Sequence, residues 1–435
     1  MTGATLMLNR LRLRMNARLG SIPAVPALLV GIVAVLLLST FAIRELFGGG
    51  VILTGDTLHA LRLRGMHECI ADGQIPCRWV PNMGRGYGYP LFNYYPPLPY
   101  YTGELLRRIF GFSYIGTVDV LFITGLLSAG VSMFLLTRKV WGDLGGVVSA
   151  VAFVYAPYLA LDTYMRGALV ELWAIAVTPA LLWAIYELIT TERLRFVPIA
   201  ALFVAFLLLS HNLTAIIMAP AIVLWTAVLL LTRGRRAWRP ALLGAAALVW
   251  GLGLAAFFTL PVLTQGDDVQ LDRLALTADG EALLYPRNFV TVNDLFLQRT
   301  DDYSLLLGAG EDTPIQIGWL HWALAGLALP AGLLYLRAKR WRPALAVLVF
   351  SAAFGIGVFM SVSKSRVIWD QFDTLRFLQF PWRYMGLVSL ASAGLAGAWL
   401  GLLRNRALWL QLVVAAVLLA IFIGGGEAFF RPLYR

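Results

Sequence analysis

Apolar residues fill stretches of roughly twenty positions along most of this chain, and polar segments of unequal length separate them. A transmembrane α-helix needs about 20 consecutive apolar residues. The pattern therefore predicts an all-α polytopic membrane protein with about eleven transmembrane helices in one integral-membrane domain, 1–435. The expected helices are 22–44, 116–137, 143–161, 170–190, two short helices within 196–231, 240–262, 315–336, 343–360, 383–403 and 407–424.

Two of these stretches need an interpretation of their own. The stretch 196–231 is too long for a single crossing, and His211 and Asn212 interrupt it, so we expect two short helices with a turn between them. The first stretch is too long for a signal peptide and lacks a small-residue cleavage pattern, so we expect it to remain as a helix.

Composition and charge placement narrow the class of protein. Only 14% of the residues are charged, against about a quarter in soluble domains, so a soluble globular protein is excluded. The net charge is +11, but the basic residues gather in short loops beside apolar stretches. That arrangement orients membrane helices and does not indicate nucleic-acid binding. The clusters are Arg10–Arg18, Arg138–Lys139, Arg193–Arg195, Arg233–Arg239, Arg337–Arg342 and Arg404–Arg406.

The basic clusters also predict how the chain lies in the membrane. They place the N-terminus in the cytoplasm and the C-terminus outside it. All long polar segments then fall on the extracytoplasmic side, as a first loop at 48–115, a fourth at 263–314 and a fifth at 361–382.

The first of these loops has the most unusual composition, because it is polar, aromatic and rich in proline. Apolar residues interleaved with arginines over 56–71 predict a helix along the membrane interface. Three prolines exclude a regular helix from the first half of 94–101. Cys69 and Cys77 close a short segment of this loop, and the oxidising outer side favours a disulfide between them. A metal role and two free thiols are the alternatives.

Asp56 is the sharpest candidate for chemistry. It directly follows the first membrane helix, where a carboxylate is costly unless it is used or paired. His59 lies three residues further on and faces the same side of a helix. Such a pair can bind a divalent metal or activate a hydroxyl as a general base. The alternative is a helix cap beside an interfacial histidine.

A second polar cluster, with Arg166 and Glu171, falls at the outer mouth of two expected helices. An arginine at this level can bind a phosphate in a forked geometry, and Glu171 can pair with it or bind a metal. A local ion pair is the alternative. His211 and Asn212 are either a substrate contact or a polar cap of their turn.

The fifth loop carries basic residues on the extracytoplasmic side, although the charge pattern predicts them on the cytoplasmic side. Arg376 and Arg383 stand among aromatic residues, where a negatively charged lipid phosphate is a physical reason for their presence. An interfacial aromatic belt is the alternative. The sequence has no phosphate-cradling GxxxxGK[ST] loop, no HExxH motif and no GxSxG motif.

Several segments resemble known membrane proteins. A carboxylate in the first outer loop, a following interfacial helix and about eleven spans resemble the glycosyltransferase-C superfamily. GDTLHALRL, GYGYPLFNYYPPLPYY, YMRGALVE and FLQFPWRY are similar to a bacterial membrane family labelled 6-pyruvoyl-tetrahydropterin synthase-related, over residues 50–390. The chain has no clustered histidine triad of the kind a pterin-synthase zinc site needs, so that activity is not expected.

The superfamily resemblance implies a function. It implies transfer of a sugar from a polyprenyl-phosphate carrier to a lipid, glycan or protein acceptor on the outer face of the bacterial cell (inner) membrane. Asp56 matches the acidic residue that such enzymes use in the first outer loop, with His59 as a helper. Glu171 is the counterpart of a second metal ligand, for Mg²⁺ or Mn²⁺, but Asp56 lacks an acidic neighbour, which puts metal dependence in doubt.

The expected substrate-binding set is Arg166, Glu171, His211, Asn212, Arg376, Arg383, Tyr94 and Tyr95. The expected partners are a polyprenyl-phosphate-linked sugar and membrane lipids, with no nucleic acid. Two functions of other classes stay open: a lipid or glycan flippase or transporter, and a noncatalytic membrane assembly subunit.

Overall fold

The computed structural model describes residues 24–48, 54–268, 284–297 and 315–432, and within these ranges the chain folds into helices and short connections without a β-strand. The long apolar helices are α2 (Ala24–Leu38) with α3 (Thr40–Ile43), α7 (Tyr114–Trp141), α8 (Asp143–Val154) with α9 (Pro157–Ala160), α10 (Leu169–Thr191), α11 (Phe196–Ser210), α12 (Asn212–Leu231), α13 (Trp238–Thr264), α17 (Trp319–Arg337), α18 (Trp341–Ser361), α21 (Met385–Ala396) with α22 (Ala398–Leu403), and α23 (Leu408–Gly426).

Shorter helices occupy the polar segments between them. The first loop contains α4 (His59–Ala71), α5 (Leu91–Tyr94) and α6 (Leu98–Phe110), and the later loops contain α16 (Val292–Phe296), α19 (Arg366–Gln371) and α20 (Asp373–Arg376). The backbone between α5 and α6 is not helical, as the prolines of this segment predict. Most of the fourth loop and the basic tail Arg10–Arg18 lie outside the described residues.

The number of membrane spans differs from the expected number. Of the described helices, 8 are long and apolar enough to cross a membrane, or up to 10 if each bent pair is one span. The bent pairs break by 45° between α2 and α3 and between α8 and α9, where Pro157 begins the second helix. Helix α11 has only 15 residues. The count of about eleven is therefore not confirmed, although every expected segment is helical.

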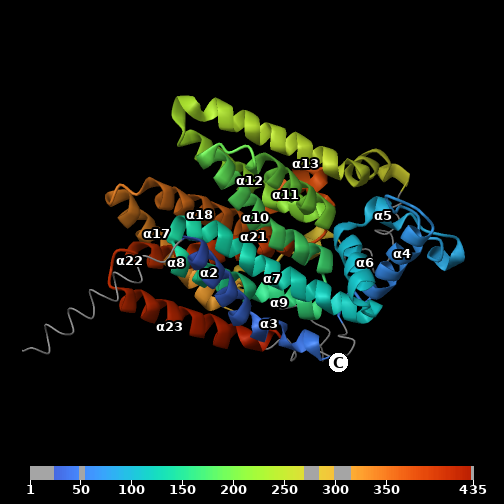
Figure 1. Cartoon of the computed structure of the whole chain (residues 1–435), viewed down its shortest axis with the longest axis horizontal. Coiled ribbons are helices and arrows are strands. Elements are labelled where there is room, and N and C mark those ends of the chain that lie inside the picture. The colour runs from blue at the N-terminus through green and yellow to red at the C-terminus, as the bar shows by residue number, and fades with distance from the viewer. Residues whose placement is uncertain (1–23, 49–53, 269–283, 298–314, 433–435) are drawn as a thin grey trace, which may run out of the picture.

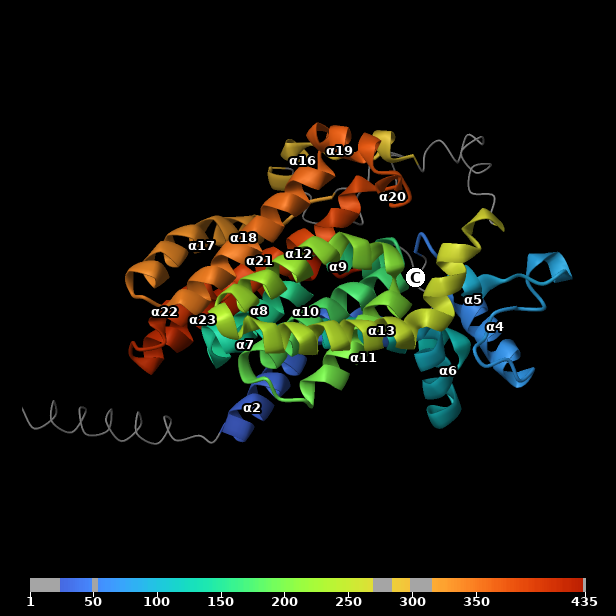
Figure 2. The same ribbon diagram turned by 90° about the horizontal axis from the view of Figure 1, so that it is seen from above.

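The helices divide into an inner and a peripheral set (Figures 1 and 2). In α10 and in the segment Pro381–Leu403, 78% and 83% of the residues of the apolar window are buried. In α23 and α13 the shares are 11% and 22%, and both helices flank the bundle in Figure 1. Because apolar side chains on a spanning helix are stable against lipid, these exposed faces need no protein partner.

The described connections that carry basic clusters, such as those from α7 to α8, from α12 to α13 and from α17 to α18, lie at one end of the bundle, away from α4, α5 and α6 (Figure 1). Arg233 pairs with Glu192, Lys139 pairs with Glu187, and the Arg340 guanidinium donates to the carbonyl of Gly401. The arrangement of helices thus agrees with the charge pattern, since the first loop lies at the end opposite to the basic connections.

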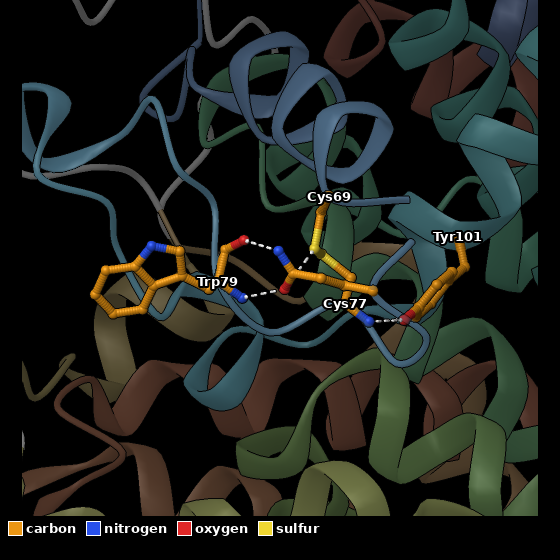
Figure 3. Close-up of a disulfide and its surroundings, with 5 residues drawn as sticks. Cys69, Cys77, Trp79 and Tyr101 are labelled. Atoms are coloured by element: carbon orange, nitrogen blue, oxygen red, sulfur yellow. Dashed lines mark hydrogen bonds between the residues drawn. A yellow bond between two sulfur atoms is a disulfide. The ribbon is translucent and has the colours of Figure 1, made fainter. Parts of the chain in front are cut away.

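A disulfide and a hydrogen-bonded turn hold the segment after α4. Cys69 of α4 and Cys77 form a disulfide with Cα atoms 5.6 Å apart (Figure 3). The Gln74 side chain donates to the Trp79 carbonyl and accepts from the Trp79 N–H, each at 3.1 Å. The Cys77 N–H donates to the Tyr101 hydroxyl on α6 at 2.7 Å. The segment therefore ties α4 to α6.

A buried carboxylate forms the second connection between α4 and α6. Glu104 on α6 has a side-chain exposure of 2%, and its oxygens lie 2.8 Å from the His67 ring and 2.9 and 2.5 Å from Arg107 and Arg108. Burial alone would raise the pKa of Glu104, but the hydrogen bonds from these partners outweigh it and lower the pKa to about 2.

We expect this carboxylate to make the first loop acid-sensitive. A carboxyl whose folded pKa is depressed stabilises the folded state above its unfolded pKa, near 4.5, and loses that contribution as the pH falls through about 2. Glu104→Gln should therefore cost about 2–3 kcal/mol of unfolding free energy at pH 7 and little near pH 2. Thermal unfolding in detergent against pH measures this loss.

Glu68→Gln is the matched control, because Glu68 pairs with the exposed Arg64 on the surface of α4. Its expected cost is below about 1 kcal/mol at any pH. Equal losses for the two variants would contradict the assigned role of Glu104.

Candidate active site

Two segments far apart in the sequence form the backbone of the site. The Gly55 N–H donates to the Met165 carbonyl at 2.7 Å, and the Asp56 N–H donates to the Arg166 carbonyl at 2.9 Å. Gly167 has a φ of 64°, and a Cβ atom there would lie 2.2 Å from the Thr54 Oγ1, so only glycine fits. These contacts place Asp56 beside Arg166.

The Asp56 carboxylate is held from several sides and remains partly open. The Arg62 Nη1 donates to its two oxygens at 2.9 and 2.7 Å. The Tyr95 hydroxyl lies 3.5 Å from Oδ2, and the Leu58 N–H donates to Oδ1 at 3.1 Å. Since α4 begins at His59 with Leu58 as its capping position, Asp56 is not the helix cap. The side chain is 29% exposed, so a substrate hydroxyl can reach it.

His59 is buried next to this carboxylate, with both ring nitrogens occupied. Its Nε2 faces the Gly167 carbonyl, which can only accept, so Nε2 carries the hydrogen. Its Nδ1 then accepts from the Tyr100 hydroxyl at 2.8 Å. The Nε2 atom is 3.8 Å from the nearer Asp56 oxygen, beyond hydrogen-bond range. This geometry favours a positioning role for His59 over proton transfer.

Electrostatics keep Asp56 charged and His59 neutral. Burial raises the pKa of Asp56, but the neighbouring His59 and Arg62 outweigh it, and the pKa lies below its ordinary value. Burial lowers the pKa of His59 more than the Asp56 charge raises it. Because His59 is therefore neutral near pH 7, the permanent positive charge beside Asp56 is that of Arg62.

A cluster of buried charges, here called the arginine cluster, contains Arg166, Arg383, Asp162 and Glu171. Arg166 pairs with Asp162 one turn earlier, and its Nη2 donates to Glu171 at 3.0 Å. The Tyr158 hydroxyl donates to Glu171 at 2.6 Å, and the Arg383 Nε lies 3.6 Å from the same carboxylate. One turn of π-helix, Leu161–Met165, sets the direction of Asp162 within this cluster.

Within the described part of the chain this cluster is incompletely bonded. The second carboxylate oxygen of the fully buried Asp162 and the Nε of Arg383 have no hydrogen-bond partner. The Arg166 guanidinium also stacks 4.5 Å above the Trp382 ring. A buried site with two guanidinium groups and an unfilled donor is suited to binding an anion such as a phosphate.

Other predicted site residues lie near Asp56 or near the arginine cluster. Tyr95 contacts Asp56 through its hydroxyl, and its ring lies 4.3 Å below the Arg62 guanidinium. His211 is buried at the turn between α11 and α12, is electrostatically coupled to Glu171, and its Nδ1 lies 2.7 Å from the Thr214 hydroxyl. The structure therefore groups Asp56, His59, Tyr95, Arg166, Glu171, His211 and Arg383 at one end of the bundle.

Three predicted residues make other contacts instead. Asn212 is the first residue of α12, and its side-chain oxygen accepts from the adjacent Leu213 N–H. The Tyr94 hydroxyl donates to the Gln265 carbonyl after α13. Arg376 is exposed and pairs with the adjacent Asp373. A substrate-binding role for these three residues stays a prediction.

Three residues near Asp56 were not predicted from the sequence. Arg62 and Tyr100 bond Asp56 and His59, and Asp119 lines a cavity together with Asp56. Arg62 and Tyr100 read as ordinary members of an interfacial helix and an aromatic run, and no local signal distinguishes them. Asp119 had a signal, because a lone carboxylate near the start of a spanning helix is costly.

The predicted metal ligands Asp56 and Glu171 have other partners in the structure. Among the described residues no three His, Cys, Asp or Glu side chains lie close enough together to hold a metal ion. Asp56 and Glu171 each bond an arginine instead. A metal bridging them would have to displace these arginines, so metal dependence stays a prediction.

Part of the chain matches a known family by sequence. Residues 92–288 match the family described as 6-pyruvoyl-tetrahydropterin synthase related domain; membrane protein. An uncharacterized protein of Lactococcus lactis subsp. cremoris (strain MG1363) is 25% identical over 209 residues, which cover 46% of this chain and 34% of that protein. The chain thus spans about a third of the relative it matches.

Solved structures match nearly the whole fold. The apo oligosaccharyltransferase of Archaeoglobus fulgidus has a TM-score of 0.51 at 16% identity, over 94% of this chain and 56% of that one. The arabinofuranosyltransferase AftD from Mycobacteria has 0.54 at 16%, over 94% and 27%. ArnT from Cupriavidus metallidurans, bound to undecaprenyl phosphate, has 0.51 at 20%, over 89% and 63%.

These likenesses confirm the predicted fold class. The chain has the polytopic helical fold of the C-type membrane glycosyltransferases, and it covers less than two thirds of each of these three proteins. Similarity at this identity concerns the fold alone, and the function is argued from the site.

Proposed function

We propose that this protein is a glycosyltransferase of the C type. In this proposal it transfers a sugar from a polyprenyl-phosphate donor to a lipid, glycan or protein acceptor on the extracytoplasmic face of the bacterial cell membrane. The observation that carries the proposal is the Asp56 carboxylate, which is ionised, partly open and held beside the arginine cluster by backbone hydrogen bonds. The chain that carries this carboxylate has a fold like that of membrane glycosyltransferases.

Asp56 is the proposed general base. An acceptor hydroxyl gives its proton to the Asp56 carboxylate while its oxygen forms a bond to the anomeric carbon of the sugar. The bond between that carbon and the donor phosphate oxygen breaks, and its electron pair leaves with the polyprenyl phosphate. Arg62 keeps the carboxylate oriented and ionised, because it binds both oxygens.

Arg166 and Arg383 are the proposed phosphate-binding residues. Charge developing on the leaving phosphate is stabilised by guanidinium groups that are already in place. Glu171 lies beside both arginines in the structure. Within the described part of the chain, the Nε of Arg383 has no hydrogen-bond partner, because it is 3.6 Å from Glu171. The structure of ArnT bound to undecaprenyl phosphate supports a polyprenyl-phosphate donor.

Transfer of label tests the proposal. Purified protein is incubated with undecaprenyl-phosphate sugars carrying a radiolabel, together with extracted envelope lipids and glycans, with and without EDTA. We expect label to leave the lipid donor and appear in a second product, and the EDTA arm decides metal dependence. Movement of unaltered donor across vesicles, with no new glycosidic product, would support the flippase alternative instead.

A further inference from the structure

A small cavity opens beside Asp56. Its volume is about 60 Å³, and its walls come from the end of the first helix pair, the segment Thr54–Ala60, the outer end of α7 and Thr163. A water molecule needs about 10–15 Å³ of such space, so the cavity holds a few waters or the reacting end of a larger molecule.

Two carboxylates face this cavity from different elements. Asp56 reaches it from the first loop, and Asp119 reaches it from the second turn of α7. Asp56 is neutralised by Arg62, whereas Asp119 has no ion pair and no hydrogen bond within the described residues. Asp119 is also half-buried. A half-buried carboxylate without a protein partner is left to hydrogen-bond with water in the cavity or with a bound hydroxyl compound.

The cavity and the arginine cluster differ in their charged groups. No lysine or arginine is among the described residues that line the cavity. On the π-helical turn, Thr163 lines the cavity, while Asp162 and Arg166 belong to the arginine cluster. The same short segment therefore separates an acidic cavity from a site with guanidinium groups, and Asp56 is accessible from the acidic side.

We propose that the acidic cavity is the acceptor site of the transfer reaction and that Asp119 binds the acceptor through its hydroxyl groups. A carboxylate accepts hydrogen bonds from hydroxyls and repels anions, so the acceptor is a neutral or cationic hydroxyl compound. The donor phosphate is held by the arginines of the arginine cluster. This assignment rests on the proposed function, because it names the acceptor side of the same reaction.

Kinetics of Asp119→Asn test the assignment. We expect the KM for the acceptor to rise about tenfold or more, with kcat changed less than about threefold and the KM for the undecaprenyl-phosphate sugar unchanged. Asp119→Glu, which keeps the charge, should recover part of the acceptor affinity. Asp72→Asn is the control, because Asp72 is an exposed carboxylate at the end of α4, outside the cavity.

A chemical probe measures the charge of the cavity without any turnover. Both cysteines of the chain are in the disulfide, so Ile115→Cys introduces one reactive thiol at a cavity-lining position that is 44% exposed. A cationic methanethiosulfonate should modify this thiol about three- to tenfold faster than an anionic one. Adding Asp119→Asn should remove most of that preference.

The two experiments separate the possible failures. If the wild-type protein transfers no sugar from any donor, the proposed function fails, and the labelling ratio still decides whether the cavity is acidic. If the wild type transfers sugar and Asp119→Asn keeps the wild-type acceptor KM, the acceptor site is wrongly assigned. Equal labelling by the two reagents overturns the acidic character of the cavity.

Discussion

Replacing Asp56 by asparagine is expected to lower kcat for sugar transfer by about 10²–10⁴-fold, the range that loss of a general base produces. Asparagine has nearly the same shape and can still accept from the Leu58 N–H, but it cannot take a proton from the acceptor hydroxyl. The measurement is the initial rate of label transfer at saturating donor and acceptor. Asp56→Glu, which keeps a base at a shifted position, should lose less.

The same assignment predicts the pH profile. Because the pKa of Asp56 lies below its ordinary value, the base stays ionised at neutral pH and the rate should not fall between pH 8 and about 6 on its account. Because Asp56→Asn leaves the Arg62 guanidinium, 12% exposed at the side chain, without its carboxylate, thermal unfolding of the variant is measured alongside its rate. A folded Asp56→Asn protein with wild-type kcat would remove Asp56 from catalysis.

Replacing Arg166 by glutamine is expected to reduce the unfolding free energy by about 3–5 kcal/mol, because it removes the counterion of the buried Asp162 and one of the two counterions of Glu171. Asp162 is fully buried and Glu171 is 3% exposed at the side chain. Arg383 remains 3.6 Å from Glu171, but Asp162 has no second partner in the described residues. Thermal unfolding of the detergent-solubilised protein measures the loss.

A double variant and a surface control make this result specific. Arg166→Gln with Asp162→Asn removes one buried charge together with its partner and should recover much of the stability. Arg376→Gln breaks a pair with Asp373, which is 83% exposed, and should change stability by less than about 1 kcal/mol. Equal effects of Arg166→Gln and Arg376→Gln would show that the cluster is not buried as the structure has it.

Local pattern predicted individual elements of the fold well. The break at His211 and the non-helical backbone between α5 and α6 follow from a polar interruption and from prolines, which act on their own neighbourhood. The bend at Pro157 was missed because the apolar stretch continues through it, although the proline was visible. The count of about eleven spans is not confirmed for the same reason, because bent and short helices leave open how many segments cross the membrane.

The site could be predicted only in part. Asp56 was identifiable because a carboxylate directly after a membrane helix is costly, and Arg383 because its charge is on the unexpected side. Their partners were not identifiable. Nothing near Asp56 in the sequence indicates that its backbone pairs with Arg166, and nothing near Tyr100 indicates that its hydroxyl fixes the tautomer of His59.

The sequence by itself determined that this protein is a bundle of membrane helices with a polar first loop and an acidic residue at its start. These features follow from the length of apolar stretches and the placement of charge, which are properties of neighbouring residues. Only the tertiary structure decided that the backbone of Asp56 bonds that of Arg166, next to Arg383, and that Asp56 and Asp119 line the same cavity. Opposite charges from distant segments are brought together by helix packing, and helix packing is not encoded in any short stretch of the chain.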